Sequence, residues 1–439
     1  MKKICCRFIC SASLFAFPLA AAAADISVDS STIFRFESRD ISGAKKQTLL
    51  PATKFLGLDV DKLADGNLSL HFNGWGRYDL ADKSFNNEKT GGSFTYGYLQ
   101  YRLNAANADI RAGRLFVHEG IVNEQIDGVS VRTDLPLGFG FSAFGGANVH
   151  TRHLADENSD GKGDGNFGGR INYRYKGMLE LGASGQYETN APTLINHITV
   201  NHRLVGGDVW LSPHKSVELM GHTSYNTETR GVAEHTYLLN VKPLKHLVLT
   251  GEFNEHRERN YFYTWVMFSQ LRNPSEKSRS LGGSASYEFS KAVEVAADYK
   301  HYTREFGNAD RYGADLKLSF LDHSVRSGLG YHYLRAGREF AISGSGNPSA
   351  SYHELRAYAM HDTKTYFASV DVLDFIFNDK INNEKNAWEA QASLGYHFTP
   401  ALAVSGDFSY GRNPEFTEEI KGLVRLTYNM TFDSKGGKK

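Results

Sequence analysis

Cysteine is almost missing from this sequence, because its only three copies lie near the N-terminus, at Cys5, Cys6 and Cys10. Beyond them the chain offers no disulfide and no thiolate metal ligand. After residue 24 it also has no apolar run of about 18 residues, which excludes a later transmembrane helix. No sign of charge dominates, since 49 basic residues balance 49 acidic ones. The charge therefore gives no reason to expect a nucleic-acid partner.

Proline is scarce as well, with 10 residues, whereas glycine (43), phenylalanine (28) and tyrosine (23) are abundant. Hydrophobic residues make up only 41% of the chain. That share is typical of soluble proteins, but transmembrane barrels have it too, because every second residue faces a polar interior. Composition alone therefore leaves both classes open.

Residues 1–24 have the features of a signal peptide. Lys2, Lys3 and Arg7 form a basic start, residues 8–19 are mostly apolar, and Ala22 to Ala24 precede Asp25 as a small-residue cleavage site. The apolar run is too short to span a bilayer as a helix. We expect export to the periplasm followed by cleavage, and the alternative is an uncleaved anchor.

A period of two dominates the rest of the chain. Over residues 423–432 apolar side chains at every second position alternate with polar ones, and the same pattern recurs at 388–398, 312–320, 281–289 and 167–175. Such alternation predicts strands with one apolar and one polar face. The segments run about ten residues, the length that crosses a bilayer at a tilt, against about five or six in soluble sheets. Aromatic residues gather at their ends, as in the interfacial girdles of membrane barrels.

Short turns, such as 105–107 and 136–137, alternate with long polar segments near 150–166, 257–278, 338–350 and 376–386. This rhythm is typical of periplasmic turns and outer loops. Backbone groups in hydrocarbon must all be paired, so the strands must close. The predicted fold is all-β: a transmembrane antiparallel up-and-down β-barrel of about 18–20 strands in the bacterial outer membrane. Residues 195–212 could form one long strand or two short ones.

We place the barrel at residues 67–432, with both ends in the periplasm. Residues 433–439 then form a basic periplasmic tail. Residues 25–66 fit the rhythm poorly, because an ascending strand at 32–38 would break the parity and 54–63 resembles a short helix. We interpret 25–66 as a lead-in that lies in the periplasm or in the lumen, and the alternative is one further pair of strands.

Charged residues stand on the polar face of many predicted strands, and a dry core could not hold so many. Barrels of sixteen or more strands leave water inside, so we expect these side chains to line a wet lumen. Both signs occur, and the sequence predicts no preference for anions or cations. The candidate lumen-lining residues are Arg77, Arg111, Arg132, Arg170, Arg174, Asp315, Lys317, Arg326, Arg356, Glu389 and Arg425.

Several stretches resemble a known group of proteins: Gly74 to Arg77, Tyr98 to Gly120, Ile126 to Gly146, and the last strand with its aromatic end. They resemble porin-like outer-membrane barrels of deltaproteobacteria. Some barrels of this kind are encoded beside multihaem c-type cytochromes and act as a sheath for a cytochrome that carries electrons across the membrane. The resemblance implies outer-membrane lipid as surroundings and periplasmic and surface cytochromes as partners.

The resemblance also implies that the barrel assembly machinery reads the aromatic end of the last strand, here Tyr428 and Phe432. In the resembling barrels the chain commonly ends at that aromatic residue. Here the tail DSKGGKK follows it, and this basic tail could touch a periplasmic partner.

One outer loop carries the spacing of a calcium loop. Oxygen-bearing side chains alternate and a glycine, Gly161, follows at the turn. Phe167 replaces the glutamate that would complete an EF-hand, so a looser surface Ca²⁺ site or an ordinary exposed loop remains. The candidate ligands are Asp156, Asn158, Asp160 and Asp164.

Histidines on the polar faces are further candidate ligands for a metal or a haem, although lone histidines of this kind are more often hydrogen-bonded wall residues. The chain has no C-x-x-C-H, so it binds no covalent haem itself, and we expect no cofactor apart from the surface Ca²⁺. These histidines are His71, His222, His256, His332 and His397.

The segment Glu119–Asp127 interrupts two predicted strands, and we favour a plain outer loop there over an inward constriction.

We predict an outer-membrane channel for small polar or charged solutes. The alternatives are the cytochrome sheath and a barrel enzyme. We expect no enzyme, because no G-x-S-x-G and no clear catalytic set is present. A transporter with a plug domain and 22 strands would need, by our expectation, a chain longer by several hundred residues.

Overall fold

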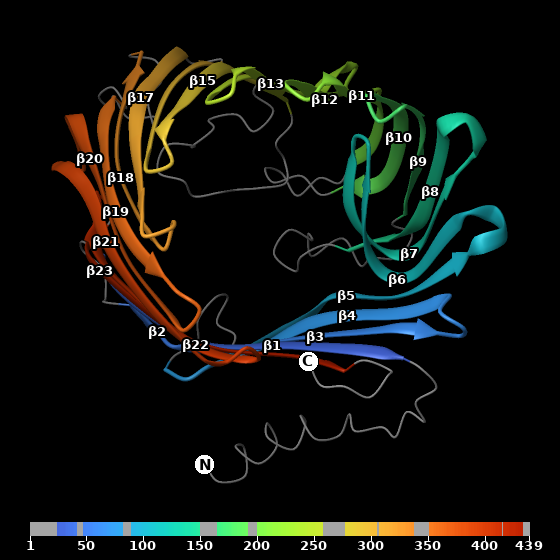
Figure 1. The fold of residues 1–439 in the computed structure, drawn as a ribbon, viewed down its shortest axis with the longest axis horizontal. Helices are drawn as coiled ribbons and strands as arrows, with labels where there is room; N and C mark the ends of the chain where they lie inside the picture. The colour runs from blue at the N-terminus through green and yellow to red at the C-terminus, as the bar shows by residue number, and fades with distance from the viewer. Residues whose placement is uncertain are drawn as a thin grey trace, which may run out of the picture.

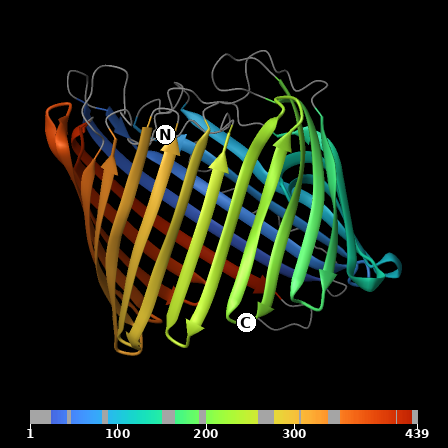
Figure 2. The ribbon, with the colours of Figure 1, turned by 90° about the horizontal axis from the view of Figure 1, so that it is seen from above.

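The computed structural model describes residues 24–41, 47–81, 89–149, 165–191, 200–257, 277–304, 307–337, 351–414 and 416–432. Within these ranges the chain forms one sheet of 23 strands in which all pairings are antiparallel. The sheet is closed, because the first strand pairs with the last as well as with its neighbours in sequence (Figure 1). Figure 2 shows the strands inclined to the barrel axis and side by side around the wall. The predicted antiparallel β-barrel is confirmed.

The strands follow one another around the wall in the order of the sequence, joined by turns and loops. Two short 3₁₀ turns, Asn104–Ala106 and Pro136–Gly138, complete the regular structure of the described ranges. No helix in these ranges has the length and apolar character needed to cross a membrane. The strands are β1 (Asp25–Ile41), β2 (Gln47–Leu49), β3 (Pro51–Leu63), β4 (Leu68–Asp79), β5 (Thr90–Leu103), β6 (Ala108–Glu119), β7 (Val122–Asp134), β8 (Phe139–Asn148), β9 (Asn166–Tyr175), β10 (Leu179–Ala191), β11 (Val200–His214), β12 (Val217–Asn226), β13 (Gly231–Leu244), β14 (Leu247–His256), β15 (Ser278–Ser290), β16 (Val293–Arg304), β17 (Gly307–Phe320), β18 (Val325–Ala336), β19 (Tyr352–Asp362), β20 (Tyr366–Ile381), β21 (Glu384–Thr399), β22 (Leu402–Arg412) and β23 (Phe416–Phe432).

The barrel begins at Asp25, so the interpretation of residues 25–66 as a lead-in is wrong. β1 closes the wall by pairing with β23 along its whole length, from Ile26 opposite Phe432 to Ile41 opposite Phe416. β3 pairs with β1 on one side and with β4 on the other. Compared with the predicted barrel at 67–432, the wall contains one further ascending strand and one further descending strand. The number of strands therefore stays even, which a single extra strand would not have allowed.

The number of strands is higher than the predicted 18–20. β2 and β3 are two pieces of one wall strand with a break at Leu50, so the 23 strands of the described ranges make 22 crossings. The chain therefore forms 22 crossings within its own length. The expectation of several hundred further residues concerned a transporter that has a plug domain in addition to 22 strands, and it stays a prediction. Several outer turns are tight, and the predicted long loop at 376–386 consists of the extended ends of β20 and β21. Residues 200–214 form the single strand β11.

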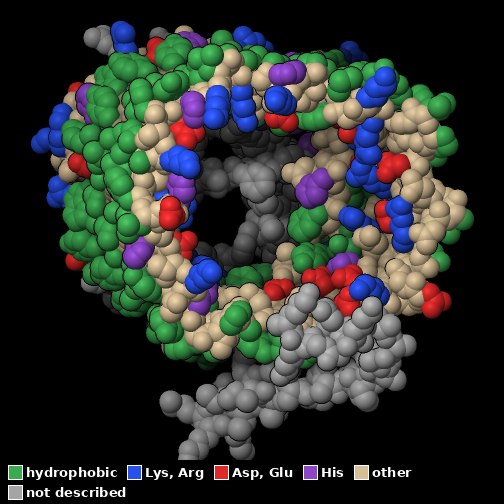
Figure 3. All heavy atoms as spheres, in the orientation of Figure 1, with side chains coloured by type: hydrophobic (Ala, Val, Ile, Leu, Met, Phe, Trp, Pro, Cys, Tyr) green, Lys and Arg blue, Asp and Glu red, His purple; other side chains and the backbone are tan. Residues whose placement is uncertain are grey.

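Apolar side chains project outward from strands throughout the described chain, and Figure 3 shows them along the left and upper outer edge of the barrel. Ile171, Leu329 and Leu394 project from three distant strands and are 59%, 60% and 64% exposed. Aromatic side chains such as Phe289 and Phe398 lie at strand ends beside the short turns. A water-facing surface would not carry apolar side chains over so large an area, whereas a lipid-facing surface requires them.

Candidate functional site: the lumen wall and an inward hairpin

The inward face of the barrel carries the charged side chains. On β9, for example, Phe167 and Ile171 are exposed outward while the alternate residues Arg170 and Asn172 are buried in the wall's interior. Figure 3 looks into the hollow and shows basic, acidic and histidine side chains around it, inside the apolar outer surface. Strand alternation makes this division unavoidable, because neighbouring residues point to opposite faces.

All eleven predicted lumen residues have the inward parity of their strands. Their neighbours along each strand, such as Ile110, Val325, Leu355 and Val424, project outward instead. The structure therefore places Arg77, Arg111, Arg132, Arg170, Arg174, Asp315, Lys317, Arg326, Arg356, Glu389 and Arg425 on the lumen side. That these side chains contact a passing solute stays a prediction.

One part of the wall holds a dense ion-pair network. The Arg170 side chain is only 9% exposed, and its Nη2 lies 2.8 Å from Glu180 Oε1 while its Nε donates to Asp208 Oδ2 at 3.0 Å. Arg174 extends the network, with Nε 3.1 Å from Glu180 Oε2 and Nη1 3.0 Å from Asp134 Oδ1. Two carboxylates neutralise the buried guanidinium, so this network holds β9, β10 and β11 together.

Four of the other nine predicted residues also lie within 4 Å of a group of opposite charge on another strand. Lys317 Nζ lies 2.9 Å from Glu294, Arg356 Nη2 2.5 Å from Asp371, and Arg326 Nη2 3.7 Å from Asp362. Glu389 lies 3.5 Å from Lys421 Nζ, and Arg111 donates to Gln100 Oε1 at 3.0 Å. Because charges of both signs are paired locally, the wall suits polar solutes of either sign.

The β6–β7 hairpin leaves the wall near its outer end. Pairing of β5 with β6 ends at Gly97 opposite Arg114, and pairing of β7 with β8 ends at Ile126 opposite Asn148. β6 and β7 nevertheless stay paired with each other as far as Glu119 opposite Val122. The segment 115–125, here called the hairpin tip, is thus a two-stranded extension. No strand of the described ranges pairs with it on either side, apart from the backbone hydrogen bond that Val149 donates to Gln125 at its base.

The bend begins at Gly113, whose φ is +132°. A Cβ at this position would lie 2.3 Å from the carbonyl oxygen of Gly97, so only glycine allows the two backbones to approach this closely. Arg114 then supports the departing strand, because its Nε and Nη2 each lie 2.7 Å from Asp127 and its Nη1 donates to the Phe94 carbonyl at 3.3 Å.

The hairpin tip folds inward and packs on the lumen face of the wall, as the strands β6 to β10 show in Figure 1. Its side chains Leu115, Val117 and Val122, together with Ile126, are at most 3% exposed and form a cluster with Phe144 on the inward face of β8. The cluster is apolar, although its residues have the inward parity. The hairpin is therefore held inside the barrel by burial of apolar surface.

The end of the hairpin reaches three further strands, β9, β10 and β11. The backbone N–H of Ile121 donates to Ser184 Oγ on β10 at 3.1 Å, and Gly120 is surrounded by Ser184, Asp208 and Arg170. The preference for a plain outer loop at Glu119–Asp127 is therefore wrong, and the inward alternative is correct. The structure narrows the lumen on the side of β6 to β11.

No protein-family model and no curated protein sequence matches the chain. Among solved structures, a mutant of the ferric enterobactin receptor PfeA from Pseudomonas aeruginosa is 9% identical, with a TM-score of 0.56 that covers 93% of this chain and 81% of that chain. PfeA in complex with BCV-L6 is 10% identical, with a TM-score of 0.56 that covers 92% and 81%. OccAB4 from Acinetobacter baumannii is 10% identical, with a TM-score of 0.47 that covers 95% and 100%.

The fold is that of an outer-membrane β-barrel. At identities this low the likeness concerns the fold alone, so the function of this barrel has to be argued from its own wall and hairpin.

The remaining predicted sites divide between described and undescribed parts of the chain. Tyr428 lies opposite Ser30 and Leu402, and Phe432 lies opposite Ile26 at the seam of the barrel. Their recognition during assembly stays a prediction. Residues 1–23 of the predicted signal peptide, the tail 433–439 and the candidate calcium ligands Asp156, Asn158, Asp160 and Asp164 lie outside the described residues.

Sequence reasoning missed the hairpin tip, although a signal was present. Along β6 the inward positions are Arg111, Gly113, Leu115 and Val117, so the inward parity changes from polar to apolar after the glycine. A strand whose lumen-facing positions become apolar must have found a second surface on which to pack. That change, read together with the glycine, indicates a departure from the wall.

Proposed function

We propose that the chain is an outer-membrane channel that passes small polar or charged solutes, with the β6–β7 hairpin tip as its constriction. The observation that supports this most strongly is the closed barrel of 22 crossings with paired charges inside and apolar side chains outside. Barrels of this size leave an aqueous interior, and pore width together with the lining side chains sets what passes.

The same proposal includes export by the N-terminal signal and insertion into the outer membrane through the aromatic end of β23. Conduction follows from the barrel alone, without any chemical step, so no catalytic residues are required. The mixed charge of the wall favours solutes that can exchange hydrogen bonds with both carboxylates and guanidinium groups.

Single-channel conductance of the refolded chain 25–439 in a planar bilayer tests the proposal. We expect stable open-channel currents, and larger currents after residues 116–124 are replaced by a short glycine-serine link, because the constriction is then absent. The control replaces the outer turn Thr227–Arg230 by the same link. This turn joins β12 to β13 at the rim, so its loss should leave the conductance unchanged.

A folded wild-type barrel that carries no current would contradict the channel proposal. If the wild-type barrel conducts but the link at 116–124 leaves the current unchanged, the channel stands and the constriction does not. Folding is checked in every case by heat-dependent mobility in gels and by β-type circular dichroism, so silence of an unfolded sample is not counted.

The cytochrome sheath implied by the resemblance remains the second proposal. A sheath has to hold a protein inside its lumen, whereas here the hairpin tip occupies part of that space. This favours the channel. Co-purification of haem with the barrel from its own cells would reverse that preference, and it can be read from the haem absorption spectrum.

A further inference from the structure

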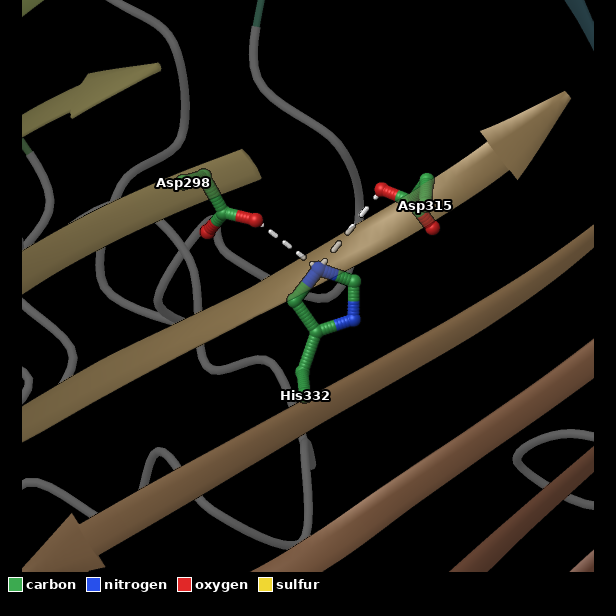
Figure 4. A group of neighbouring side chains, drawn as sticks. All are labelled: Asp298, Asp315 and His332. Atoms are coloured by element: carbon green, nitrogen blue, oxygen red, sulfur yellow. Dashed lines mark hydrogen bonds and ion pairs between the residues drawn. The ribbon is translucent and has the colours of Figure 1, made fainter. Parts of the chain in front are cut away.

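Three neighbouring strands bring ligand-type side chains together on the inward wall, far along the chain from the hairpin. Asp298 comes from β16, Asp315 from β17 and His332 from β18. His332 Nε2 lies 2.8 Å from Asp298 Oδ2 and 3.7 Å from Asp315 Oδ2. Figure 4 shows both carboxylates pointing at this one nitrogen.

The register of the strands builds this arrangement. Asp298 and His332 both lie opposite Gly313, so their side chains meet across a residue that has none. A Cβ at Gly313 would stand 2.2 Å from His332 Cδ2, and a Cβ at Gly330 would stand 2.5 Å from Asp315 Oδ1. Two glycines therefore leave the room in which the imidazole and the second carboxylate lie.

The imidazole is held from its other side as well. His332 Nδ1 faces Glu354 Oε1 on β19 at 3.7 Å, and the His332 side chain is only 9% exposed. Arg311 Nη1 lies 2.9 Å from Asp298 Oδ1, the oxygen that points away from the histidine. A histidine that binds a metal through one nitrogen commonly has a carboxylate near the other nitrogen, which orients the ring.

One proton on His332 Nε2 provides a hydrogen bond to only one of the two carboxylates that face this nitrogen. A single Nε2 proton can be donated to Asp298 at 2.8 Å, whereas Asp315 accepts no hydrogen bond from the residues that the structure describes. The Asp315 side chain is 38% exposed toward the lumen. Three carboxylates surround one imidazole, and Arg311 pairs with Asp298. The cations nearest to Asp315, Lys317 and Arg356, are paired with Glu294 and Asp371, so the cluster leaves a carboxylate to which a further cation can bind.

We propose that Asp298, Asp315 and His332 bind a divalent transition-metal ion of the Zn²⁺ type on the lumen wall. The ion takes the place of the Nε2 proton and keeps water as its fourth ligand. Zinc lies about 2.0–2.2 Å from histidine nitrogen and carboxylate oxygen, so tetrahedral ligands stand roughly 3.3 Å apart, close to the observed 2.8 and 3.7 Å. Mixed nitrogen and oxygen ligands suit Zn²⁺ and exclude a site built for Ca²⁺ alone.

Titration of Zn²⁺ into the refolded chain 25–439 in detergent, followed by calorimetry, tests the site without any need for conduction. We expect one strong site per barrel, and Co²⁺ in its place should give the visible absorption of a tetrahedral complex. His332→Ala should abolish strong binding, and Glu354→Gln, which leaves all three ligands in place, should weaken it by about 10-fold to 100-fold. The control is His71→Asn, because His71 also faces the lumen and pairs with one carboxylate, Asp59, at 2.6 Å.

The proposal is overturned if the wild-type barrel binds Zn²⁺ no more tightly than His332→Ala, or if His71→Asn removes the binding as effectively as His332→Ala. Asp315→Asn gives a second variant that should fold, because it changes a partly exposed side chain and adds no volume. Retained strong binding in both Asp315→Asn and His332→Ala would likewise exclude the site.

Discussion

Neighbouring residues along each strand of this protein meet two different solvents. On β19, for example, Leu355 projects outward and is 43% exposed, whereas the next residue, Arg356, projects inward and contacts Asp371. This difference follows from strand geometry alone. The alternation in the sequence therefore predicted the orientation of individual side chains well, and it did so without knowledge of how the strands are ordered around the wall.

A matched pair of arginine substitutions tests this division. Val370 on β20 is outward and 52% exposed, and Gln391 on the neighbouring strand β21 has the inward parity. Val370→Arg should destabilise the barrel by about 2–4 kcal/mol, because it places a charge in hydrocarbon. Gln391→Arg should change stability by less than about 1 kcal/mol, because the side chain stays in water beside Asp371. Urea unfolding in lipid vesicles measures both, and equal costs would contradict the assignment of the faces.

At the scale of the element, the hairpin shows where pattern reading stops. The period of two predicts that a strand exists. A strand that leaves the wall and packs inside the barrel keeps the same period, so the sequence pattern does not reveal which residues it contacts. Pairing of β6 with β5 ends at Arg114 while pairing with β7 continues. The cause is tertiary, because Phe144 and Ser184 offer a second surface inside the barrel. The cluster of Asp298, Asp315 and His332 could not be predicted for the same reason. Its residues come from three strands, and only the register between these strands brings them together.

The absence of cysteine after residue 10 makes the position of the hairpin directly testable. Ile121→Cys combined with Ser184→Cys should form a disulfide on mild oxidation, because the Ile121 N–H donates to Ser184 Oγ at 3.1 Å. Phe116→Cys with Ser184→Cys is the control, since Phe116 is 40% exposed while its neighbours Leu115 and Val117 are buried. Non-reducing gels show the cross-link as a change in mobility. Equal cross-linking of both pairs, or none in the first, would mean that the tip does not rest on β10.

At the scale of the whole molecule, stability depends on closure. In lipid, a strand edge leaves peptide groups without partners, and each unpaired group costs several kcal/mol. The seam between β1 and β23 removes both edges at once, with pairing that runs from Ile26 to Ile41. Sequence reasoning could not locate this seam, because residues 25–66 repeat the alternation weakly and the closing partner lies at the far end of the chain.

Deletion of residues 25–66 distinguishes the wall strands from a dispensable lead-in. If these residues were a lead-in, a chain that begins at Asn67 after the signal would still fold into a barrel. Because β1, β2 and β3 complete the wall, we expect instead that β4 and β23 are left as open edges, and that no barrel with heat-dependent mobility or protease resistance accumulates in the outer membrane. The control is the link that replaces residues 116–124, which shortens the chain without removing a crossing and should still assemble. A resistant barrel from the shortened chain would mean that β4 and β23 can pair directly, and that the cylinder closes with two strands fewer than its sequence encodes.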